Sequence, residues 1–322
     1  MPAAPKTESG GMLAIAARPR FGVFSGGEMG SSAMNRAMNS LLVGAAAILV
    51  AACSQSPAPP DEIVAAERAF AAEGYASGIK RSFLAFSAPD AVIFGPEPVN
   101  AHDSLNASPD EDLSEPRARL VWWPLYAGIA NSGDLGFTTG PYAIDEDRRG
   151  HYFTIWKKQP DGAWKWVLDA GVGADASHEA DQGAAASYLP ASRQKSASPE
   201  KALSEVSALE SAIAGAARRN LKSAYEPHLD DDSRLHSKGP PPAKTSGDRT
   251  AAFDARPETL DFSPLGGGAS MAGDLVWSYG EGRFTEAGEQ RTGYYVRVWQ
   301  KRRAGWRLVF DEYLPPPPHP GQ

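Results

Sequence analysis

GDLGFTTGPYAIDEDRRGHYFTIWKKQPDGAWKWVLD, residues 133–169, alternates apolar and polar side chains, turns, and alternates again. A period of two residues is typical of antiparallel β-strands joined by short turns. Residues 273–311 repeat the pattern as GDLVWSYGEGRFTEAGEQRTGYYVRVWQKRRAGWRLVFD. Both copies have the Gly-Asp-Leu start, a Gly-x-Tyr that opens a strand, the Trp that closes it, and the final Trp and Asp. The repeat predicts that the chain holds two versions of one module.

Helices are predicted ahead of the strands in both halves. Asp61 can cap a helix, and apolar residues continue at helical spacing through Phe70 and Phe86. In the second half Ser198 can cap a helix that has Pro199 at its first position. Further short strands are expected at 90–95, 120–129, 234–237 and from residue 260 onward. The order predicts an α+β fold with two tandem cone-shaped modules, each with N-terminal helices packed on a curved antiparallel sheet.

Composition divides the 322 residues into six segments. The Ala-, Ser- and Gln-rich stretch 174–198 lacks sustained periodicity, which is typical of a linker. Met34 or Met38 would each make a more ordinary start of a signal peptide than Met1, so we expect an over-extended start. The predicted segments are a presequence and lipoprotein signal peptide at 1–52, a tether at 53–60, a first module at 61–173, a linker at 174–198, a second, degenerate module at 199–314, and a Pro-rich tail at 315–322.

The single cysteine of the chain, Cys53, follows an apolar run of signal-peptide length, LLVGAAAILVAA at 41–52. The run is preceded by Arg36 and is short for a membrane span, which needs about 20 apolar residues. Small residues directly before the cysteine resemble the lipobox of bacterial lipoproteins, whose cysteine becomes the lipidated first residue after cleavage. The resemblance implies a protein anchored by lipid at Cys53 on the periplasmic side of a bacterial envelope. Ser54 is compatible with the outer rather than the inner membrane.

The charge balance argues against a nucleic-acid partner. The net charge is −7, and no basic stripe is present that could neutralise phosphates. His228 and His236 flank three aspartates at 230–232, but their spacing matches no closed metal site. The glycines at 266–268 lack the Lys-Ser/Thr and the following helix of a phosphate-binding loop. We therefore expect no metal and no cofactor.

Both halves resemble the SnoaL-like, nuclear transport factor 2-like superfamily, particularly its uncharacterised domain families. The resemblance rests on the helix with ERAFAAEG, the DAVIFGPEPVN segment, GDLGFTTGP, and the GHYFTIWKKQPDGAWKWVLD hairpin. The second copy departs from it at DSRLHSKGPPP, where the strand and loop are degenerate. In this superfamily the face of the sheet under the helices forms a pocket, and the other face often packs against a partner module. The resemblance implies that the two modules pair as an intramolecular pseudo-dimer.

The hairpin register predicts which side chains share a face. If QPDG forms the turn, Lys158 lies opposite Ala163, Trp156 opposite Lys165, Thr154 opposite Val167 and Tyr152 opposite Asp169. The second copy places Trp299 opposite Arg307 and Tyr295 opposite Asp311. We expect a Trp-cation contact and a Tyr-carboxylate contact on this face of each module, where two sheets meet. The core face, under the helices, is expected to carry His151, Phe153, Ile155, Trp164, Trp166 and Leu168. The equivalent residues of the second copy are Tyr294, Val296, Val298, Trp306, Leu308 and Phe310.

Candidate catalytic residues follow from the resemblance. Catalytic members of the superfamily, such as ketosteroid isomerases, dehydratases and polyketide cyclases, use an Asp or His in the pocket with a Tyr or Asp that steadies an oxyanion. The candidates here are His151, Asp169 and Tyr152, of which His151 points with the apolar set. Asp169 would serve as a base only if the opposite face met the helices. We favour the alternative that His151 is a histidine at the mouth of the core with one ordinary hydrogen bond.

A pocket in the first module would be lined by aromatic side chains. Trp122, Trp123, Tyr126 and His151 are the candidates, although aromatics on a strand also suit a core, and neighbouring Trp122 and Trp123 must face opposite ways. We expect a lipid-anchored, periplasm-facing protein that binds a small apolar ligand or an envelope partner without catalysis. The alternative is an enzyme of the isomerase, cyclase or hydrolase type with its pocket in the first module. A third hypothesis is a purely structural protein whose modules are filled by their own tryptophans.

Overall fold

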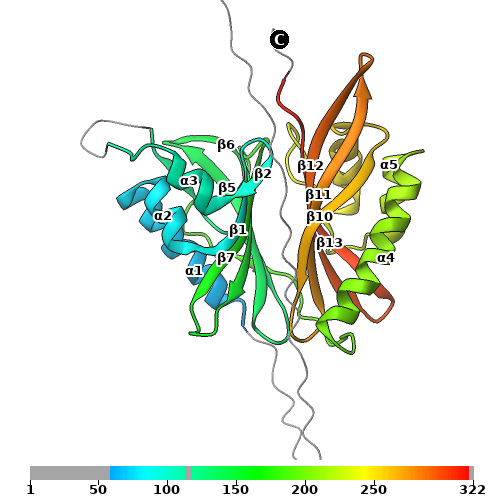
Figure 1. Cartoon of the computed structure of the whole chain (residues 1–322), viewed down its shortest axis with the longest axis horizontal. Coiled ribbons are helices and arrows are strands. Elements are labelled where there is room, and N and C mark those ends of the chain that lie inside the picture. The colour runs from blue at the N-terminus through cyan, green and yellow to red at the C-terminus, as the bar shows by residue number, and fades with distance from the viewer. Residues whose placement is uncertain (1–58, 113–117, 319–322) are drawn as a thin grey trace, which may run out of the picture. The chain divides into compact units, whose positions relative to one another are not determined.

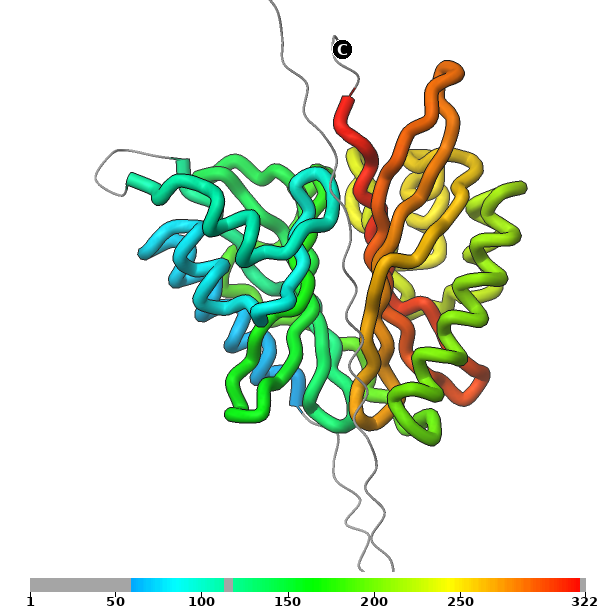
Figure 2. Tube along the Cα trace, viewed as in Figure 1, coloured from blue at the N-terminus to red at the C-terminus, as the bar shows by residue number. Residues whose placement is uncertain are grey.

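The structure is a computed structural model that describes residues 59–112 and 118–318. The predicted presequence and Cys53 lie outside the described residues. Within these ranges the α+β prediction is confirmed, because the chain forms two sheets, each preceded in sequence by helices. Figure 2 follows the chain from the blue helices of the first module through its cyan and green segments to the second module, which runs from yellow-green to red.

The first sheet has the strand order β2-β1-β7-β6-β5-β4-β8, with β3 paired to β5. Its strands are β1 (Ser87–Phe94), β2 (Pro98–Asn100), β3 (Leu120–Trp122), β4 (Tyr126–Ile129), β5 (Leu135–Ile144), β6 (Asp147–Lys158), β7 (Trp164–Gly173) and β8 (Ser187–Tyr188). The predicted strand at 120–129 is split into β3 and β4 around Pro124, which has no N–H to donate to a ladder. Strand β8 lies within the stretch predicted as linker and pairs with β4.

Three helices cover one face of the first sheet (Figure 1). They are α1 (Asp61–Ser77), α2 (Ile79–Phe86) and α3 (Ala101–Ala107). Helix α1 buries Ile63, Glu67, Phe70 and Gly74 at helical spacing. It ends at Gly78, whose φ of 91° is a conformation that glycine adopts without strain. The predicted cap at Asp61 is wrong, because the helix already includes this residue and Pro60 takes the cap position.

The second sheet has the order β10-β11-β12-β13-β9. Its strands are β9 (Arg234–His236), β10 (Asp261–Ala269), β11 (Leu275–Glu286), β12 (Glu289–Arg302) and β13 (Gly305–Leu314). The helices of this module are α4 (Pro199–Ala217), α5 (Leu221–Tyr225) and α6 (Arg249–Asp254), with short 3-10 turns η1 (Glu226–His228) and η2 (Ser246–Asp248). The predicted Ser198 cap is confirmed, since its side chain accepts a hydrogen bond from the backbone N–H of Lys201. Among the described residues, no helix is both long and apolar enough to cross a membrane.

The predicted hairpin register is wrong in both modules. Lys158 lies opposite Trp164 because the turn holds five residues, closed by a 2.8 Å hydrogen bond from the N–H of Gln159 to the carbonyl of Ala163. A β-bulge then adds Val167, so that Thr154 rather than Tyr152 lies opposite Asp169. The same shift in the second module changes both predicted pairs: Trp299 lies opposite Leu308 and Tyr295 opposite Tyr313, while Arg297 lies opposite Asp311.

The predicted orientation is also wrong for β6, whereas Trp166 of β7 packs against Phe70 and Phe83 of the helices as predicted. Tyr152 lines the cavity under the helices, and Trp156 donates a 2.9 Å hydrogen bond to Glu67 of α1. Phe153 points the other way and stacks on Phe310 of the second sheet, with ring centroids 3.9 Å apart. Because the helices bury one face of the sheet and the second sheet buries the other, both faces are apolar, and alternation does not distinguish them.

The bulges divide the set of residues predicted to face the helices. His151, Phe153, Val296, Val298 and Phe310 lie between the two sheets. Trp164 and Trp306 lie on the helix side, where their indole N–H groups donate to Glu62 and Glu205, respectively. The predicted Trp-cation pairs are replaced by others: Lys158 lies 5.5 Å from the Trp164 ring and Lys301 lies 5.6 Å from the Trp306 ring.

The contacts between the modules include a reciprocal pair of loops. The backbone N–H of Asn131 donates to Asp274 at 2.8 Å, and the backbone N–H of Met271 donates to Asp134 at 3.0 Å. Asp134 and Asp274 are the aspartates of the two Gly-Asp-Leu signals, so each module gives the other the same contact. Such reciprocity is the pattern of an isologous interface.

Candidate functional site

A cavity of about 320 Å³ lies between the helices and the sheet of the first module. Its wall is formed by α1, α2, α3 and strands β1, β3, β5, β6 and β7. Most of the lining is apolar or aromatic, which is typical of small-molecule sites. The lining residues are Phe70, Ile79, Phe83, Ile93, Phe94, Leu105, Leu120, Trp122, Tyr142, Tyr152, Asp169, Ala170 and Gly171.

Asp169 is the one carboxylic acid among these lining residues. It accepts a 2.7 Å hydrogen bond from the hydroxyl of Thr154 on the neighbouring strand. Burial raises the pKa of Asp169 to about 8, against the opposing effect of the Thr154 hydrogen bond and with a further contribution from the nearby Glu67. The carboxyl group is therefore mostly protonated at pH 7 and loses its proton at about pH 8, whereas an ordinary aspartate is ionised at both pH values.

Tyr152 brings a second polar group to the cavity. Its side chain is 6 % exposed, and its hydroxyl is buried without a hydrogen-bond partner in the described part of the chain. Burial, together with the nearby Glu67, raises the pKa of Tyr152 well above its usual value, so the hydroxyl stays protonated. A buried, unpaired hydroxyl costs free energy that a bound polar group would recover.

Glu67 is a buried carboxyl beneath the cavity whose contacts are structural. It accepts hydrogen bonds from the indoles of Trp122 at 2.6 Å and Trp156 at 2.9 Å, and from the hydroxyl of Thr138 at 2.5 Å. The second module has the same arrangement, since Glu210 of α4 accepts hydrogen bonds from Ser278 at 2.5 Å and from Trp299 at 2.9 Å. The repetition indicates that this carboxyl connects the first helix to the sheet in both modules.

The second module carries the counterpart of Asp169, but there an ionic network occupies the site. Asp311 accepts hydrogen bonds from Arg256 at 2.5 Å, Arg297 at 3.1 Å and Tyr225 at 3.1 Å. Arg297 stands where the first module has Thr154, because each lies directly opposite its aspartate. Arg297 is 1 % exposed and lies 3.9 Å from the ring centroid of Tyr295, the counterpart of Tyr152. The arginine side chains thus fill the second module with paired charges.

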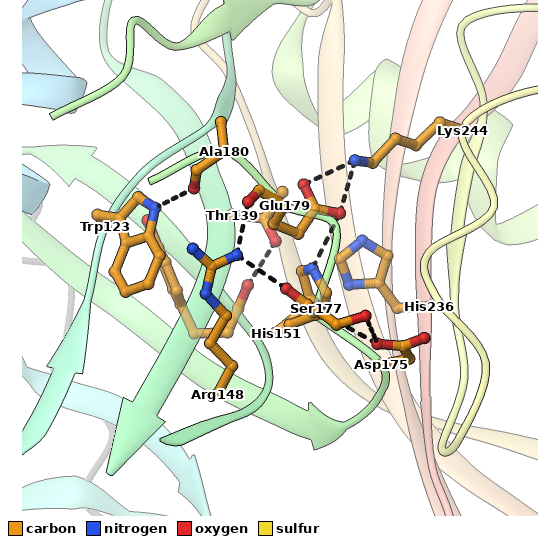
Figure 3. A network of polar contacts seen from close by, with 12 residues as sticks. Trp123, Thr139, Arg148, His151, Asp175, Ser177, Glu179, Ala180, His236 and Lys244 are labelled. Carbon is orange, nitrogen blue, oxygen red and sulfur yellow. Dashed lines mark hydrogen bonds and ion pairs between the residues drawn. The ribbon is translucent and has the colours of Figure 1, made fainter. Parts of the chain in front are cut away.

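His151, one of the three catalytic candidates, is not among the residues that line this cavity. It is 3 % exposed, and its ring centroid lies 5.4 Å from that of His236 in the second module. Figure 3 shows His151 beside Glu179, with Lys244 on the far side of the same carboxylate. Its Nε2 atom lies 3.3 Å from Glu179 Oε1, and Lys244 Nζ lies 2.6 Å from that oxygen. The histidine therefore belongs to a separate polar site at the seam between the modules.

The other predicted pocket residues are spread over three places. Trp122 lines the cavity of the first module. Trp123 points away, as adjacent strand residues must, and its indole N–H donates to the carbonyl of Ala180 at 3.0 Å (Figure 3). Tyr126 lies at the seam, where the guanidinium carbon of Arg234 is 3.4 Å from its ring centroid. Cys53, the predicted lipidation site, lies outside the described residues.

Thr154 and Tyr142 were not among the predicted site residues, although both bear on the cavity. A signal for Thr154 exists: aligning GHYFTIW with GYYVRVW places threonine and arginine at one position of the two copies. Tyr142 lies in the turn-proximal half of β5, which alternation alone does not connect with the helices.

Neither a protein-family profile nor a curated protein sequence matches this chain. Solved structures of the nuclear transport factor 2-like fold do. One, a protein of unknown function from Pseudomonas putida KT2440, is 15% identical, covers 39% of this chain and 94% of its own, and has a TM-score of 0.33. Another, from Shewanella oneidensis MR-1, is 15% identical over 34% of this chain and 97% of its own, with a TM-score of 0.30. A third, from Salmonella enterica, is 13% identical over 38% and 96%, with a TM-score of 0.30.

Proposed function

We propose that the first module binds a small, mainly apolar molecule in the cavity under its helices. The observation that carries this proposal is the cavity itself: about 320 Å³, lined by aromatic and aliphatic side chains around one carboxyl group, Asp169. The apolar wall supplies most of the binding free energy, at roughly 25 cal/mol per Å² of apolar surface removed from water. Asp169 and Tyr152 orient the ligand by hydrogen bonds to one polar group of the ligand.

The two modules have different roles in this proposal. In the second module, Arg256 and Arg297 pair with Asp311 at the position equivalent to Asp169, so the proposal does not place the apolar ligand there. It covers the outer face of the first sheet, where Phe310 stacks on Phe153. The reciprocal loop contacts support the inference that the second module is the pseudo-dimer partner of the first.

Thr154→Arg is expected to abolish ligand binding, because it places the arginine of the second module beside Asp169 and fills the cavity. The probe is N-phenylnaphthylamine, a neutral apolar dye whose fluorescence rises on burial. We expect the full chain to bind the dye saturably and the variant to bind it at least about tenfold more weakly. A tenfold change in Kd corresponds to a loss of about 1.4 kcal/mol of binding free energy. Thr154→Ser keeps the hydroxyl beside Asp169 and is expected to bind normally.

Two further variants make this result decisive. Thr250→Arg adds the same side chain on α6, away from the cavity, and is expected to leave dye binding unchanged. Leu105→Trp fills the cavity from α3 without adding charge, which covers the case in which Thr154→Arg fails to fold. Dye binding that survives both Thr154→Arg and Leu105→Trp would place the ligand elsewhere and refute the proposal.

A second candidate function is acid–base catalysis in the same cavity. The specific observation in its favour is a proton acceptor whose pKa is about 8 next to a buried, protonated hydroxyl. A base titrating near the working pH can take a proton from carbon beside a carbonyl, while Tyr152 donates a hydrogen bond to the oxygen that becomes negative. An isomerase, cyclase or hydrolase would use these groups.

We also propose that the chain is anchored by lipid at Cys53 on the periplasmic side of the envelope, more specifically at the outer membrane. The support is the apolar run at 41–52 and the small residues before the cysteine. Mass spectrometry of the protein isolated from membranes is expected to show an acylated N-terminal Cys53. An unmodified Cys53, or peptides that retain residues before it, would refute the anchor, and Cys53→Ser should release the protein from membranes.

A further inference from the structure

A second cavity of about 320 Å³ lies at the seam between the two modules, apart from the cavity of the first module. Its wall combines side chains from the first sheet, from the segment that precedes β8, and from β9 and the loop after it. The residues that determine its chemistry are Tyr126, His151, Glu179, Arg234, His236 and Lys244. The site exists only where both modules meet, and it is mainly polar.

The charged side chains that line the seam cavity are two cations, Arg234 and Lys244, and one carboxylate, Glu179. Burial raises the pKa of Glu179, but hydrogen bonds from His151 and Lys244 outweigh this effect and lower the pKa to about 2. Glu179 is therefore ionised and paired with Lys244, whose Nζ lies 2.6 and 2.7 Å from its two oxygens. Arg234 remains. Within residues 59–112 and 118–318, no carboxylate lies within ion-pair distance of its guanidinium. Burial lowers the pKa of Arg234, and the more distant charges of Glu179 and Asp232 offset only part of this effect.

Arg234 is held in a fixed orientation. Its guanidinium carbon lies 3.4 Å from the ring centroid of Tyr126, a distance typical of a stacked cation–π contact. The side chain is half-buried, and a guanidinium has five N–H donors at the edges of its plane, more than a contact with Tyr126 alone can use. A preoriented guanidinium loses little conformational freedom when it binds a planar or tetrahedral anion.

The histidines provide the remaining polar groups. His151 is 3 % exposed, and its Nδ1 atom is buried without a hydrogen-bond partner in the described part of the chain. His236 is 2 % exposed, and its Nδ1 atom lies 3.3 Å from the buried carboxyl of Glu312. Burial lowers the pKa of His236 well below its usual value, so this ring is neutral at pH 7. The seam cavity thus places two imidazoles beside the guanidinium of Arg234.

We propose that the seam cavity binds a small molecule through an oxyanion, a carboxylate or a phosphate group, held by Arg234 with His151 and His236 beside it. A guanidinium makes two parallel N–H···O hydrogen bonds with either group, and these are stronger than neutral hydrogen bonds. The anion would pair with Arg234, and Lys244 stays fixed on Glu179. Because both modules supply the lining, a bound anion stabilises the docked arrangement of the two modules.

The test is a calorimetric titration of the full chain with inorganic phosphate and, separately, with succinate, at an ionic strength held constant with sodium chloride. We expect saturable binding of at least one of the two probes, and the probe that binds identifies the anionic group. Arg234→Gln is expected to weaken binding by about tenfold or more, the factor for losing one charge-assisted hydrogen bond. Arg218→Gln, which removes an exposed guanidinium at the end of α4, is the matched control and should bind normally.

A measurement on the unmodified protein covers the case in which Arg234→Gln does not fold. Added phosphate or succinate, but not chloride, should shift the imidazole NMR resonances of His151 and His236. The proposal is overturned if neither probe binds saturably, if Arg234→Gln binds as well as the unmodified chain, or if Arg218→Gln loses as much affinity as Arg234→Gln.

Discussion

Asp311→Asn is expected to lower the free energy of unfolding by about 3–5 kcal/mol, because it removes the carboxylate between two buried arginines. Arg256 and Arg297 are 7 % and 1 % exposed, and both pair with Asp311. Without this carboxylate, two positive charges would lie together inside the second module, and the 3.8 Å contact between Arg297 and Glu210 could offset only part of the loss. Urea denaturation at neutral pH measures the loss.

The same substitution in the first module should behave in the opposite way. The pKa of Asp169 is raised from 3.8 to about 8, so the folded chain keeps a proton that the unfolded chain releases between these pH values. The contribution of Asp169 to stability is therefore complete below about pH 4 and decreases as the pH rises to about 8. Asp169→Asn should remove this decrease and leave the protein at least as stable at pH 8.

These two variants serve as controls for each other. Both variants carry the same Asp→Asn change at equivalent positions of the two modules. A difference between their free energies of unfolding therefore reports the surroundings of each aspartate and not the chemistry of the substitution. Comparable losses of stability from Asp169→Asn and Asp311→Asn at neutral pH would show that both aspartates are ion-paired, contrary to the structure. A stability profile for Asp169→Asn that still falls between pH 4 and 8 as steeply as the unmodified chain's would point to another titrating group.

If the cavity is catalytic, Asp169→Asn should reduce the rate by about 10²–10⁴-fold, which is the usual contribution of a general base. The reaction to follow by NMR is the exchange of deuterium into the carbon positions beside the carbonyl of cyclohexanone in deuterated water. The rate should rise with pH and level off above about 8, where Asp169 is deprotonated. Tyr152→Phe should slow the exchange without changing this pH profile.

Two outcomes of the exchange experiment separate catalysis from binding. Asp169→Asn that binds N-phenylnaphthylamine but no longer exchanges deuterium would assign the base to Asp169. An unmodified chain that binds the dye and shows no exchange above the buffer rate would reject the catalytic candidate and leave ligand binding as the function. Asp147→Asn, an exposed substitution on β6, is the matched control for both readouts.

The positions of the long strands could be predicted from the sequence, because alternation sustained over ten residues is rare outside β-strands. The order of helices and strands followed from the helical spacing of apolar residues, from the Ser198 cap and from the repeat. The orientation of β6 could not be predicted. Both of its faces are buried, so the apolar character of Phe153 and Ile155 suits a second sheet as well as a helix layer.

The candidate site depended on that orientation and on one inserted residue. Val167 forms the bulge in β7, which places Asp169 opposite Thr154 and on the same side as Trp166. Nothing in WKWVLD marks which residue bulges, because every residue there is compatible with a regular strand. Asp169 was predicted to act as a base only if the opposite face of the hairpin met the helices. The structure meets this condition, because Tyr152 and Asp169 both line the cavity under the helices.

The seam site could not be predicted from the sequence for a different reason. Arg234 and His236 come from the segment that departs from the repeat, and Glu179 comes from the stretch predicted as linker. Residues so far apart in the chain are brought together only by the docking of the two sheets.

The most direct test of the central claim is the titration of the side-chain carboxyl carbon of Asp169 by carbon NMR, with Asp169→Asn used to assign the signal. We predict a midpoint near pH 8, because the carboxyl group lies in the apolar cavity under the helices. A midpoint near 3.8, the value of an ordinary aspartate, would show that the group is hydrated or ion-paired and would contradict the assignment of the cavity.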